Sequence, residues 1–346
     1  MRQETTNPCR NRARHGVTKQ PAEQLEHAGR LLRPLSRCVA RAVPPLHLAM
    51  LVFLNGQFVP ADQAVVPVSD RGFLLGDGVF ETVPVFGGRP FCWRQHLARF
   101  ESGTRVLGIA SPYSTGELNR FANELIRRND CPESILRLTL TRGSGGRGYS
   151  PRNAGPATLV MTLAAAPAKA RPESGCWRVI RASARVAPGG VLAGVKHTSR
   201  LLNVLARAEA EASGADEALL LTAGDEVVEA AAGNVFCLDR GAVVTPPLAV
   251  GALPGITRAI VLGLCGQLKI PAEVRPLRIE GDAFADGMFI TLSTRGIVEV
   301  SHLDGRQLSR SPITRRLRDA YAGVVDAFRR GEAGDLECLA PFPPSA

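Results

Sequence analysis

Four short apolar runs follow one another in the second half of the chain. Each is four or five residues long and rich in aliphatic side chains, and turns holding glycine separate them; the runs are 218–222, 227–230, 234–238 and 242–245. Runs of this kind predict buried strands. Helical runs lie on both sides, at 201–212 and 257–264. Short strands between helices predict a mixed α/β fold built around a sheet.

A second unit of the same class precedes residue 166. Apolar runs on either side of Asn55-Gly56 predict a hairpin of strands 51–54 and 57–59, because this dipeptide fits a two-residue turn. The remaining predicted strands lie at 79–86, 134–141, 157–163, 177–187, 272–275 and 287–293, and the remaining helices at 94–107, 117–128 and 314–330. We therefore expect a smaller domain over 50–165, a connection over 166–175, a larger domain over 176–332 and a tail over 333–346.

Residues 1–49 differ from the rest of the chain. They hold nine Lys or Arg and three glutamates, and so carry +6 of the net charge of +10. Five prolines interrupt them, which predicts a disordered basic extension, or a true translation start at Met50. The other residues carry only +4 and show no aromatic residues interleaved with basic ones, a pattern that argues against a nucleic-acid surface.

Two further patterns limit the class of protein. No run of 18 apolar residues occurs, so we expect no membrane-spanning segment. The eight cysteines form no CxxC pair and show no spacing typical of a metal site. These patterns predict a cytoplasmic protein in a reducing compartment, without a metal centre.

The stretch 195–203, Val-Lys-His-Thr-Ser-Arg-Leu-Leu-Asn, carries the chemistry. It places Lys196 after a glycine-rich approach and directly before a helical run, and only three lysines occur after residue 49. A single lysine is usually a solvated surface group. Partial burial beside Val195 would lower its pKa and make the amine nucleophilic toward an aldehyde.

An acid and a helix start follow the lysine. Glu229 lies 33 residues later in a predicted strand, and Gly255-Ile256-Thr257-Arg258 begins a predicted helix. Alone, these features indicate a solvated acid and a capped helix. Together, an amine, an acid and a helix N-terminus are what pyridoxal 5'-phosphate requires for its aldehyde, its ring nitrogen and its phosphate.

In this order and spacing the chain resembles the class IV, or fold type IV, pyridoxal-phosphate enzymes over about residues 51–308. The resemblance implies two α/β domains with the cofactor in the cleft between them, a small-molecule substrate and a homodimer. It also implies that Lys196 is the catalytic residue that bonds the cofactor and that Glu229 pairs with the ring nitrogen. The implied phosphate ligands are Arg99 in His-Leu-Ala-Arg-Phe, Ile256, Thr257, and Thr294 in Ser-Thr-Arg-Gly.

Within residues 142–150, Arg-Gly-Ser-Gly-Gly-Arg-Gly-Tyr-Ser, the six residues 143–148 match the GxGxxG pattern of dinucleotide-binding folds. That fingerprint must open a helix, whereas here Pro151, Pro156 and another predicted strand follow. We expect instead a loop that encloses a small anionic substrate. The predicted substrate-binding residues are Arg147, which would clamp a carboxylate, Tyr149 and Phe80.

Within the family, this loop and the tract 192–197 resemble the aminodeoxychorismate lyases, which release 4-aminobenzoate and pyruvate in folate synthesis. Branched-chain aminotransferases generally carry Gly-Asn-Tyr after the lysine, where this chain has Ser199-Arg200-Leu201. D-amino-acid aminotransferases share an arginine in the glycine loop. Ser199 departs from the lyase pattern, which often has Asn there. The sequence therefore predicts a lyase, with D-amino-acid or branched-chain transamination as the alternative, and nucleic-acid binding through 1–49 as the non-enzyme alternative.

A chain shortened to begin at Met50 should keep full activity and stability, because nothing in the pattern of residues 1–49 predicts that they pack on the rest. Activity and thermal unfolding of the two lengths test this. A large loss of either would contradict it. Salt-sensitive nucleic-acid binding that disappears with the extension would support the non-enzyme alternative.

Overall fold

The computed structural model describes residues 50–166, 175–280 and 284–332. The chain divides into two units, 1–43 and 44–346, and all described residues belong to the second. The predicted extension over 1–49, the tail over 333–346 and most of the connection over 166–175 lie outside the described residues.

The first sheet is antiparallel throughout and has the strand order β2-β1-β6-β5-β3-β4. Its strands are β1 (Leu51–Leu54), β2 (Gln57–Pro60), β3 (Gly78–Phe86), β4 (Arg89–Pro90), β5 (Ser134–Thr141) and β6 (Thr158–Ala165). The helices of this region are η1 (Ala61–Gln63), α2 (Arg71–Leu75), α3 (Trp93–Leu107) and α4 (Thr115–Arg128). The predicted hairpin at Asn55-Gly56 is confirmed.

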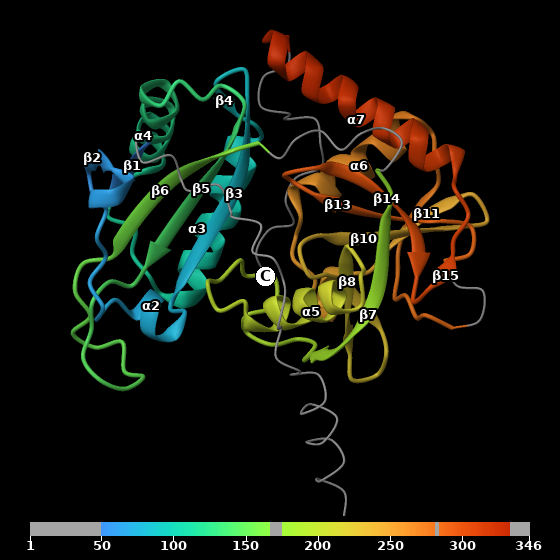
Figure 1. Cartoon of the computed structure of the whole chain (residues 1–346), viewed down its shortest axis with the longest axis horizontal. Helices are drawn as coiled ribbons and strands as arrows, with labels where there is room; N and C mark the ends of the chain where they lie inside the picture. The colour runs from blue at the N-terminus through green and yellow to red at the C-terminus, as the bar shows by residue number, and fades with distance from the viewer. Residues whose placement is uncertain (1–49, 167–174, 281–283, 333–346) are drawn as a thin grey trace, which may run out of the picture. The chain divides into compact units, whose positions relative to one another are not determined.

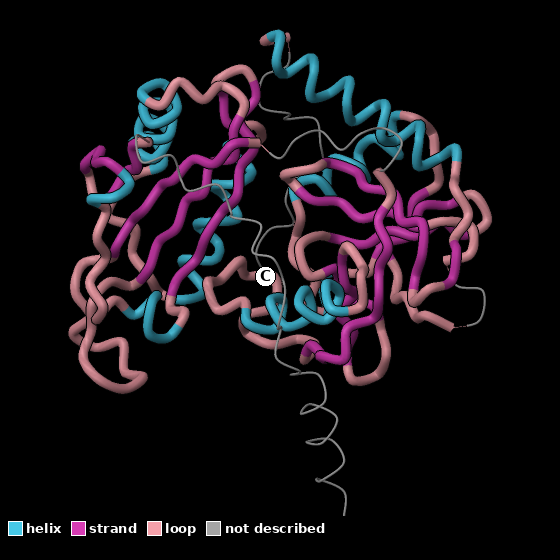
Figure 2. The backbone as a smooth tube through the Cα atoms, in the orientation of Figure 1, coloured by secondary structure: helices cyan, strands magenta, loops and turns pink. Residues whose placement is uncertain are grey.

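The second sheet is mixed and has the order β12-β11-β10-β13-β14-β7-β8-β9, with β15 paired to β14 (Figures 1 and 2). Its strands are β7 (Trp177–Val186), β8 (Glu217–Thr222), β9 (Val227–Ala230), β10 (Asn234–Asp239), β11 (Ala242–Thr245), β12 (Ala272–Val274), β13 (Met288–Leu292), β14 (Gly296–Leu303) and β15 (Arg306–Gln307). Its helices are α5 (Leu201–Ala212), η2 (Leu248–Val250), α6 (Ile256–Gln267) and α7 (Pro312–Arg330). The predicted mixed α/β class is confirmed.

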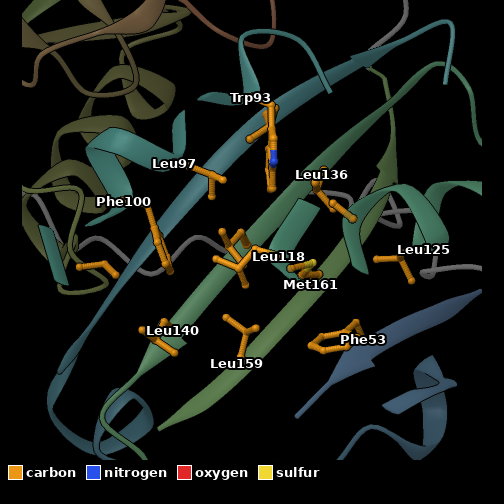
Figure 3. Packing of buried hydrophobic residues seen from close by; sticks show 14 of the residues in the cluster. Phe53, Trp93, Leu97, Phe100, Leu118, Leu125, Leu136, Leu140, Leu159 and Met161 are labelled. Atoms are coloured by element: carbon orange, nitrogen blue, oxygen red, sulfur yellow. The ribbon is translucent and has the colours of Figure 1, made fainter. Parts of the chain in front are cut away.

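Alternation along the strands decides which side chains enter the core. In β5, Leu136, Leu138 and Leu140 are fully buried, whereas Ile135, Arg137 and Thr139 lie on the opposite face. Figure 3 shows the apolar side chains of α3 and α4 packed over this core face. Burying one such leucine stabilises the fold by roughly 1.5–3 kcal/mol.

Both faces of the second sheet are buried. Helices cover one face, and on the other the strand side chains pack against one another, among them Leu219, Val235 and Ile290. Helices α6 and α7 pack with Phe236 and Phe289, whose rings stack with centroids 4.8 Å apart. Alanines 206 and 210 of α5 pack on β7 and β8, where small side chains let the helix approach closely. Because both faces are buried, β8 and β10 are continuous apolar runs rather than alternating ones.

The structure corrects two features of the sequence interpretation. β14 was not predicted, yet it lies between β13 and β7 inside the second sheet. Its first residue, Gly296, is the last residue of the Ser-Thr-Arg-Gly turn that was assigned to phosphate binding, so the residues that follow were not read as a separate strand. The short helix α2 was also missed, because five residues are too few to show helical periodicity.

As predicted, the GxGxxG loop is not part of a dinucleotide-binding fold. It joins β5 and β6, which pair antiparallel from Ser134↔Ala165 to Thr141↔Thr158. Among the described residues, no helix is long and apolar enough to cross a membrane.

We predict that Asp70→Ala lowers the free energy of unfolding by about 2–4 kcal/mol. The buried Asp70 carboxylate accepts hydrogen bonds from the Gly72 amide and from the Thr141 and Thr158 hydroxyls, each at 2.8 Å, so it caps α2 and ties it to β5 and β6. Urea unfolding measures the loss, with exposed Asp62→Ala as the matched control. A difference between the two variants below about 1 kcal/mol would contradict this account.

Candidate active site

A cavity of about 310 Å³ gathers side chains from both sheets. Its walls come from β3, α3, the 196–203 segment, the 229–234 turn, the N-terminus of α6 and the β13–β14 turn. The lining residues are Phe80, Thr82, Arg99, Lys196, Arg200, Asn203, Glu229, Ala231, Ala232, Gly233, Asn234, Leu253, Gly255, Ile256, Thr257, Thr291, Leu292, Ser293 and Thr294. They include all six residues assigned to the cofactor from sequence, and Phe80.

The backbone around Lys196 is fixed by the first sheet. The Phe80 amide donates to the Lys196 carbonyl at 2.9 Å, and the Thr198 amide donates to the Gly78 carbonyl at 2.8 Å. A short bridge between Val79 and His197 completes this antiparallel pairing. The lysine therefore belongs in sequence to the second half of the chain but is held by β3.

The Lys196 amine is poised for nucleophilic chemistry. Burial and the charge of Arg99 lower the pKa of Lys196 to about 7, against the opposing effect of Glu81. Its Nζ lies 4.6 Å from the centroid of the Phe80 ring, and no hydrogen bond or ion pair joins it to another described residue. Much of the amine is therefore neutral near pH 7, the form that adds to an aldehyde.

Glu229 presents a buried carboxyl group to the same cavity. It lies in β9, and one oxygen, Oε2, accepts a hydrogen bond from the Leu253 amide at 2.9 Å. Burial raises the pKa of Glu229 above its ordinary value, against the lowering effects of that hydrogen bond and of Arg200. A buried carboxylate of this kind is stabilised by a cationic partner, such as a protonated ring nitrogen.

Arg99 is held rigidly by a buried acid. Its Nε and one terminal nitrogen donate to the two carboxylate oxygens of Glu81 at 2.8 and 2.7 Å. His96 adds a third bond, between Nδ1 and Glu81 Oε2, at 2.7 Å. Burial acts to raise the pKa of Glu81, but Arg99 and His96 hold it well below its usual range. The planar fork fixes the direction of the guanidinium, whose remaining N–H groups can meet an anion.

The N-terminus of α6 completes an anion cradle. Its N-cap residue is Gly255, with no capping side chain, so the first amides of the helix, those of Ile256 and Thr257, are open to an external acceptor. An added Cβ at Gly255 would lie 1.9 Å from Asn234 Oδ1, so this buried side chain, which donates to the Leu253 carbonyl, would have to shift. The hydroxyl of Thr291, which also lines the cavity, is buried without a hydrogen-bond partner.

These residues fit pyridoxal 5'-phosphate. The cavity offers one reactive amine at Lys196, one buried acid at Glu229, and an anion cradle formed by Arg99, the α6 amides and Thr294. An uncapped helix end beside a buried arginine is unfavourable without an anion and favourable with one. Among the described residues, no group of three His, Cys, Asp or Glu could hold a metal ion.

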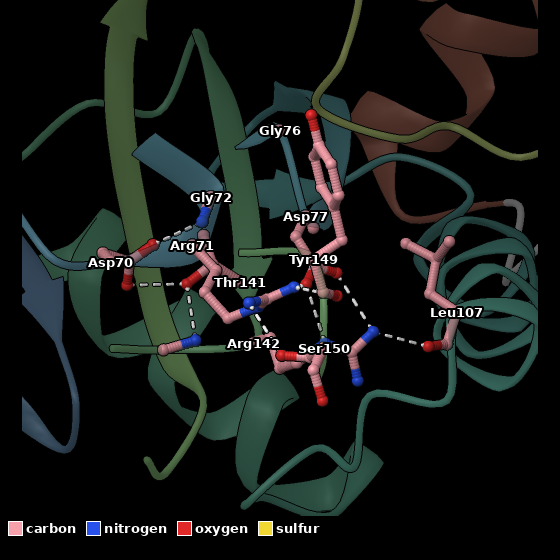
Figure 4. A network of polar contacts seen from close by, with 12 residues as sticks. Asp70, Arg71, Gly72, Gly76, Asp77, Leu107, Thr141, Arg142, Tyr149 and Ser150 are labelled. Carbon is pink, nitrogen blue, oxygen red and sulfur yellow. Dashed lines mark hydrogen bonds and ion pairs between the residues drawn. The ribbon is translucent and has the colours of Figure 1, made fainter. Parts of the chain in front are cut away.

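The glycine loop is organised by a separate polar network (Figure 4). Arg71 donates to Asp77 at 2.8 Å and to the carbonyls of residues 148, 149 and 150 at 3.1–3.3 Å. Arg142 donates to the same aspartate at 2.8 Å. The loop residues assigned to the substrate, Arg147 and Tyr149, are exposed and do not line this cavity.

Several cavity residues were missed from sequence. Arg200, Asn203 and Asn234 line the cavity, and Asn234 Nδ2 donates to the Leu253 carbonyl at 2.8 Å. In the sequence, the indication that these residues belong to the site was that they lie close to Lys196 or Glu229. Glu81 carried a stronger signal, since it occupies the apolar face of a strand, where a buried acid requires a cationic partner.

Comparison with known proteins gives matches along most of the chain. The family model for amino-transferase class IV matches residues 78–303. A Methanocaldococcus jannaschii protein provisionally named branched-chain-amino-acid aminotransferase is 34% identical over 279 residues, which cover 80% of this chain and 96% of the relative. The D-alanine aminotransferase of Staphylococcus haemolyticus is 27% identical and covers 80% of this chain and 98% of that protein.

Solved structures agree with these matches. The 4-amino-4-deoxychorismate lyase of Pseudomonas aeruginosa is 33% identical, with a TM-score of 0.70, over 80% of this chain and 100% of that one. A branched-chain amino acid aminotransferase solved with pyridoxamine 5'-phosphate is 28% identical, with a TM-score of 0.78, over 85% of this chain and 98% of that one. With its cavity built around Lys196, this chain belongs to the class IV aminotransferase family of pyridoxal-phosphate enzymes.

Proposed function

We propose that the protein is a 4-amino-4-deoxychorismate lyase, acting in folate synthesis. The supporting observation begins three residues after Lys196, where branched-chain aminotransferases generally carry Gly-Asn-Tyr and this chain carries Ser199-Arg200-Leu201. Arg200 lines the cavity, so the difference falls inside the site. The similarity to the Pseudomonas aeruginosa lyase over that protein's full length is in agreement with this proposal.

The reaction needs no second substrate. The substrate ring loses one proton, the enolpyruvyl side chain leaves as pyruvate, and the ring becomes the aromatic ring of 4-aminobenzoate. When bound, pyridoxal 5'-phosphate withdraws the electrons left behind by the departing proton. Because aromatisation drives the elimination, the protein has to position groups and move protons.

Lys196 is the proton carrier in this proposal. Its amine, with a pKa of about 7, can accept the ring proton and then donate to the departing side chain. Two other hydroxyl groups lie nearby in sequence, but neither Thr198 nor Ser199 lines the cavity. The Thr198 hydroxyl instead donates to the Gly76 carbonyl at 2.7 Å.

The other side chains hold the reacting groups. Glu229 pairs with the ring nitrogen and keeps it protonated. Arg99, Ile256, Thr257 and Thr294 bind the phosphate, which frees Lys196 to move without loss of the cofactor.

We further propose a homodimer in which the glycine loop of each subunit serves the partner's cavity. Arg147 and Tyr149 are exposed, and the Tyr149 side chain is 87% accessible. Large apolar side chains are exposed on α2 and α5, including Phe73 at 74% and Leu201 at 66%. Apolar groups exposed in this number are typical of surfaces covered by another subunit. Arg147 would then bind a substrate carboxylate through paired hydrogen bonds.

Transamination is the second candidate. The 34% and 27% identities to aminotransferases support it, because all cofactor contacts would be shared. In that reaction Lys196 removes the same type of proton, but the amino group stays behind until a 2-oxo acid collects it.

The purified protein should be yellow, and borohydride should leave the pyridoxyl group irreversibly attached to Lys196, since this is the one lysine of the cavity. Peptide mass spectrometry locates the label, and Lys196→Ala should prevent it. Lys269→Ala, at a lysine outside the cavity, is the matched control and should still be labelled at Lys196. A label on another residue, or a colourless protein that cannot be reconstituted, would overturn the assignment.

Aminodeoxychorismate should give 4-aminobenzoate and pyruvate in equal amounts. Lys196→Ala should abolish this activity, and Arg147→Lys should raise KM by about tenfold, because lysine keeps the charge but not the paired hydrogen bonds. Exposed Arg152→Lys, in the same loop, is the control. Turnover of D-alanine or a branched-chain amino acid with 2-oxoglutarate, without 4-aminobenzoate, would exclude the lyase.

A further inference from the structure

Arg200 contacts the backbone on both sides of Lys196. One terminal nitrogen donates to the Val195 carbonyl at 2.6 Å, and Nε donates to the His197 carbonyl at 3.1 Å. These carbonyls belong to the residues directly before and directly after the lysine. A planar guanidinium can hold two acceptors in one fixed geometry, which a lysine ammonium cannot reproduce.

The same arginine faces the cavity. It lines the cavity together with Lys196 and Glu229, and it stands at the N-cap of α5, so its backbone is fixed by the helix that follows. Nε and one terminal N–H are used by the two carbonyls, which leaves further donors on the guanidinium. Arg200 therefore combines two backbone contacts with a positive charge beside the amine.

We propose that Arg200 is a positioning residue for Lys196, which clamps the peptide groups on both sides of the lysine and places a fixed positive charge beside its amine. The inference rests on the proposed role of Lys196. It adds a separate requirement, that the amine be held in place and kept available before any cofactor or substrate arrives.

The charge balance around the amine supports this role. Four charged groups act on Lys196. Two are cations, Arg99 of α3 and Arg200 at the N-cap of α5, and two are acids, Glu81 of β3 and Glu229 of β9. Glu81 is already bound by Arg99 and His96. Arg200 has no buried acid within hydrogen-bond distance among the described residues, and the nearby Glu229 carboxyl acts on it only through space. A like charge disfavours the protonated amine.

The backbone contacts support the positioning half of the proposal. Residues 196–198 pair with β3 through only two amide hydrogen bonds, Phe80 to Lys196 and Thr198 to Gly78. The preceding residues 189–194 are rich in glycine, two of which have positive φ. Glycine restricts the backbone less than any other residue and the pairing is short, so the guanidinium adds a restraint at the lysine itself.

Two variants separate the charge of Arg200 from its hydrogen bonds. Arg200→Gln removes the charge and the fork, whereas Arg200→Lys keeps the charge and loses the fork. Arg207→Gln is the matched control, because Arg207 lies two turns further along α5 with a side chain that is 43% exposed. Circular dichroism checks that each variant folds.

The charge is tested on the cofactor-free protein by trace labelling with acetic anhydride across the neutral pH range, with the extent of Lys196 modification read by peptide mass spectrometry. The native amine should titrate near pH 7. Arg200→Gln should raise that midpoint, because a like charge is removed, whereas Arg200→Lys and Arg207→Gln should leave it near the native value. An unchanged midpoint in Arg200→Gln, or an equal rise in Arg200→Lys, would overturn the charge effect.

The clamp is tested by amide hydrogen exchange of the peptide that spans residues 195–203. Both Arg200 variants should speed exchange in this peptide, and Arg207→Gln should not. Native exchange in both variants would overturn the positioning role. Failure of the proposed chemistry is distinguishable, because it would show as borohydride labelling away from Lys196, while these two measurements still report on Arg200.

Discussion

The pairing of residues 196–198 with the start of β3 is the contact on which the site depends. It attaches the reactive lysine to the first sheet, although the acid and the helix that complete the cavity come from the second half of the chain. Phe80 takes part twice, because its amide holds the Lys196 carbonyl and its ring lies beside the amine. A change in this pairing would move the amine relative to every other group in the cavity.

The turn at Leu253 and Pro254 connects the remaining polar groups of the cavity. The Leu253 amide donates to Glu229, and the Leu253 carbonyl accepts from Asn234. The Pro254 carbonyl accepts from Arg99. Glu229, the proposed partner of the ring nitrogen, Arg99, a proposed phosphate ligand, and the start of α6 are thus coupled through two consecutive residues. Since each partner is buried, loss of one would leave an unsatisfied group and disturb the others.

The sequence predicted the elements that carry local signals, and the family resemblance pointed to residues that line the cavity. Hairpins and helices depend on neighbours in sequence, whereas Glu229, 33 residues from Lys196, was assigned from the family resemblance. The strand β14 was missed because its pattern begins at a turn, and Arg200 was read only as a family marker because its contacts are visible only in three dimensions. The exposed position of Arg147 was also beyond sequence reasoning, because a loop residue's place relative to a cavity depends on how distant segments pack.

The number of turnovers without a 2-oxo acid separates a lyase from a transaminase. The holoenzyme is given an excess of aminodeoxychorismate alone, and 4-aminobenzoate is counted per active site over time. A lyase built around Lys196 needs no amino acceptor, so many equivalents of 4-aminobenzoate should form, with matching pyruvate. A reaction that stops at or below one equivalent per site, and resumes only when a 2-oxo acid is added, would contradict the account.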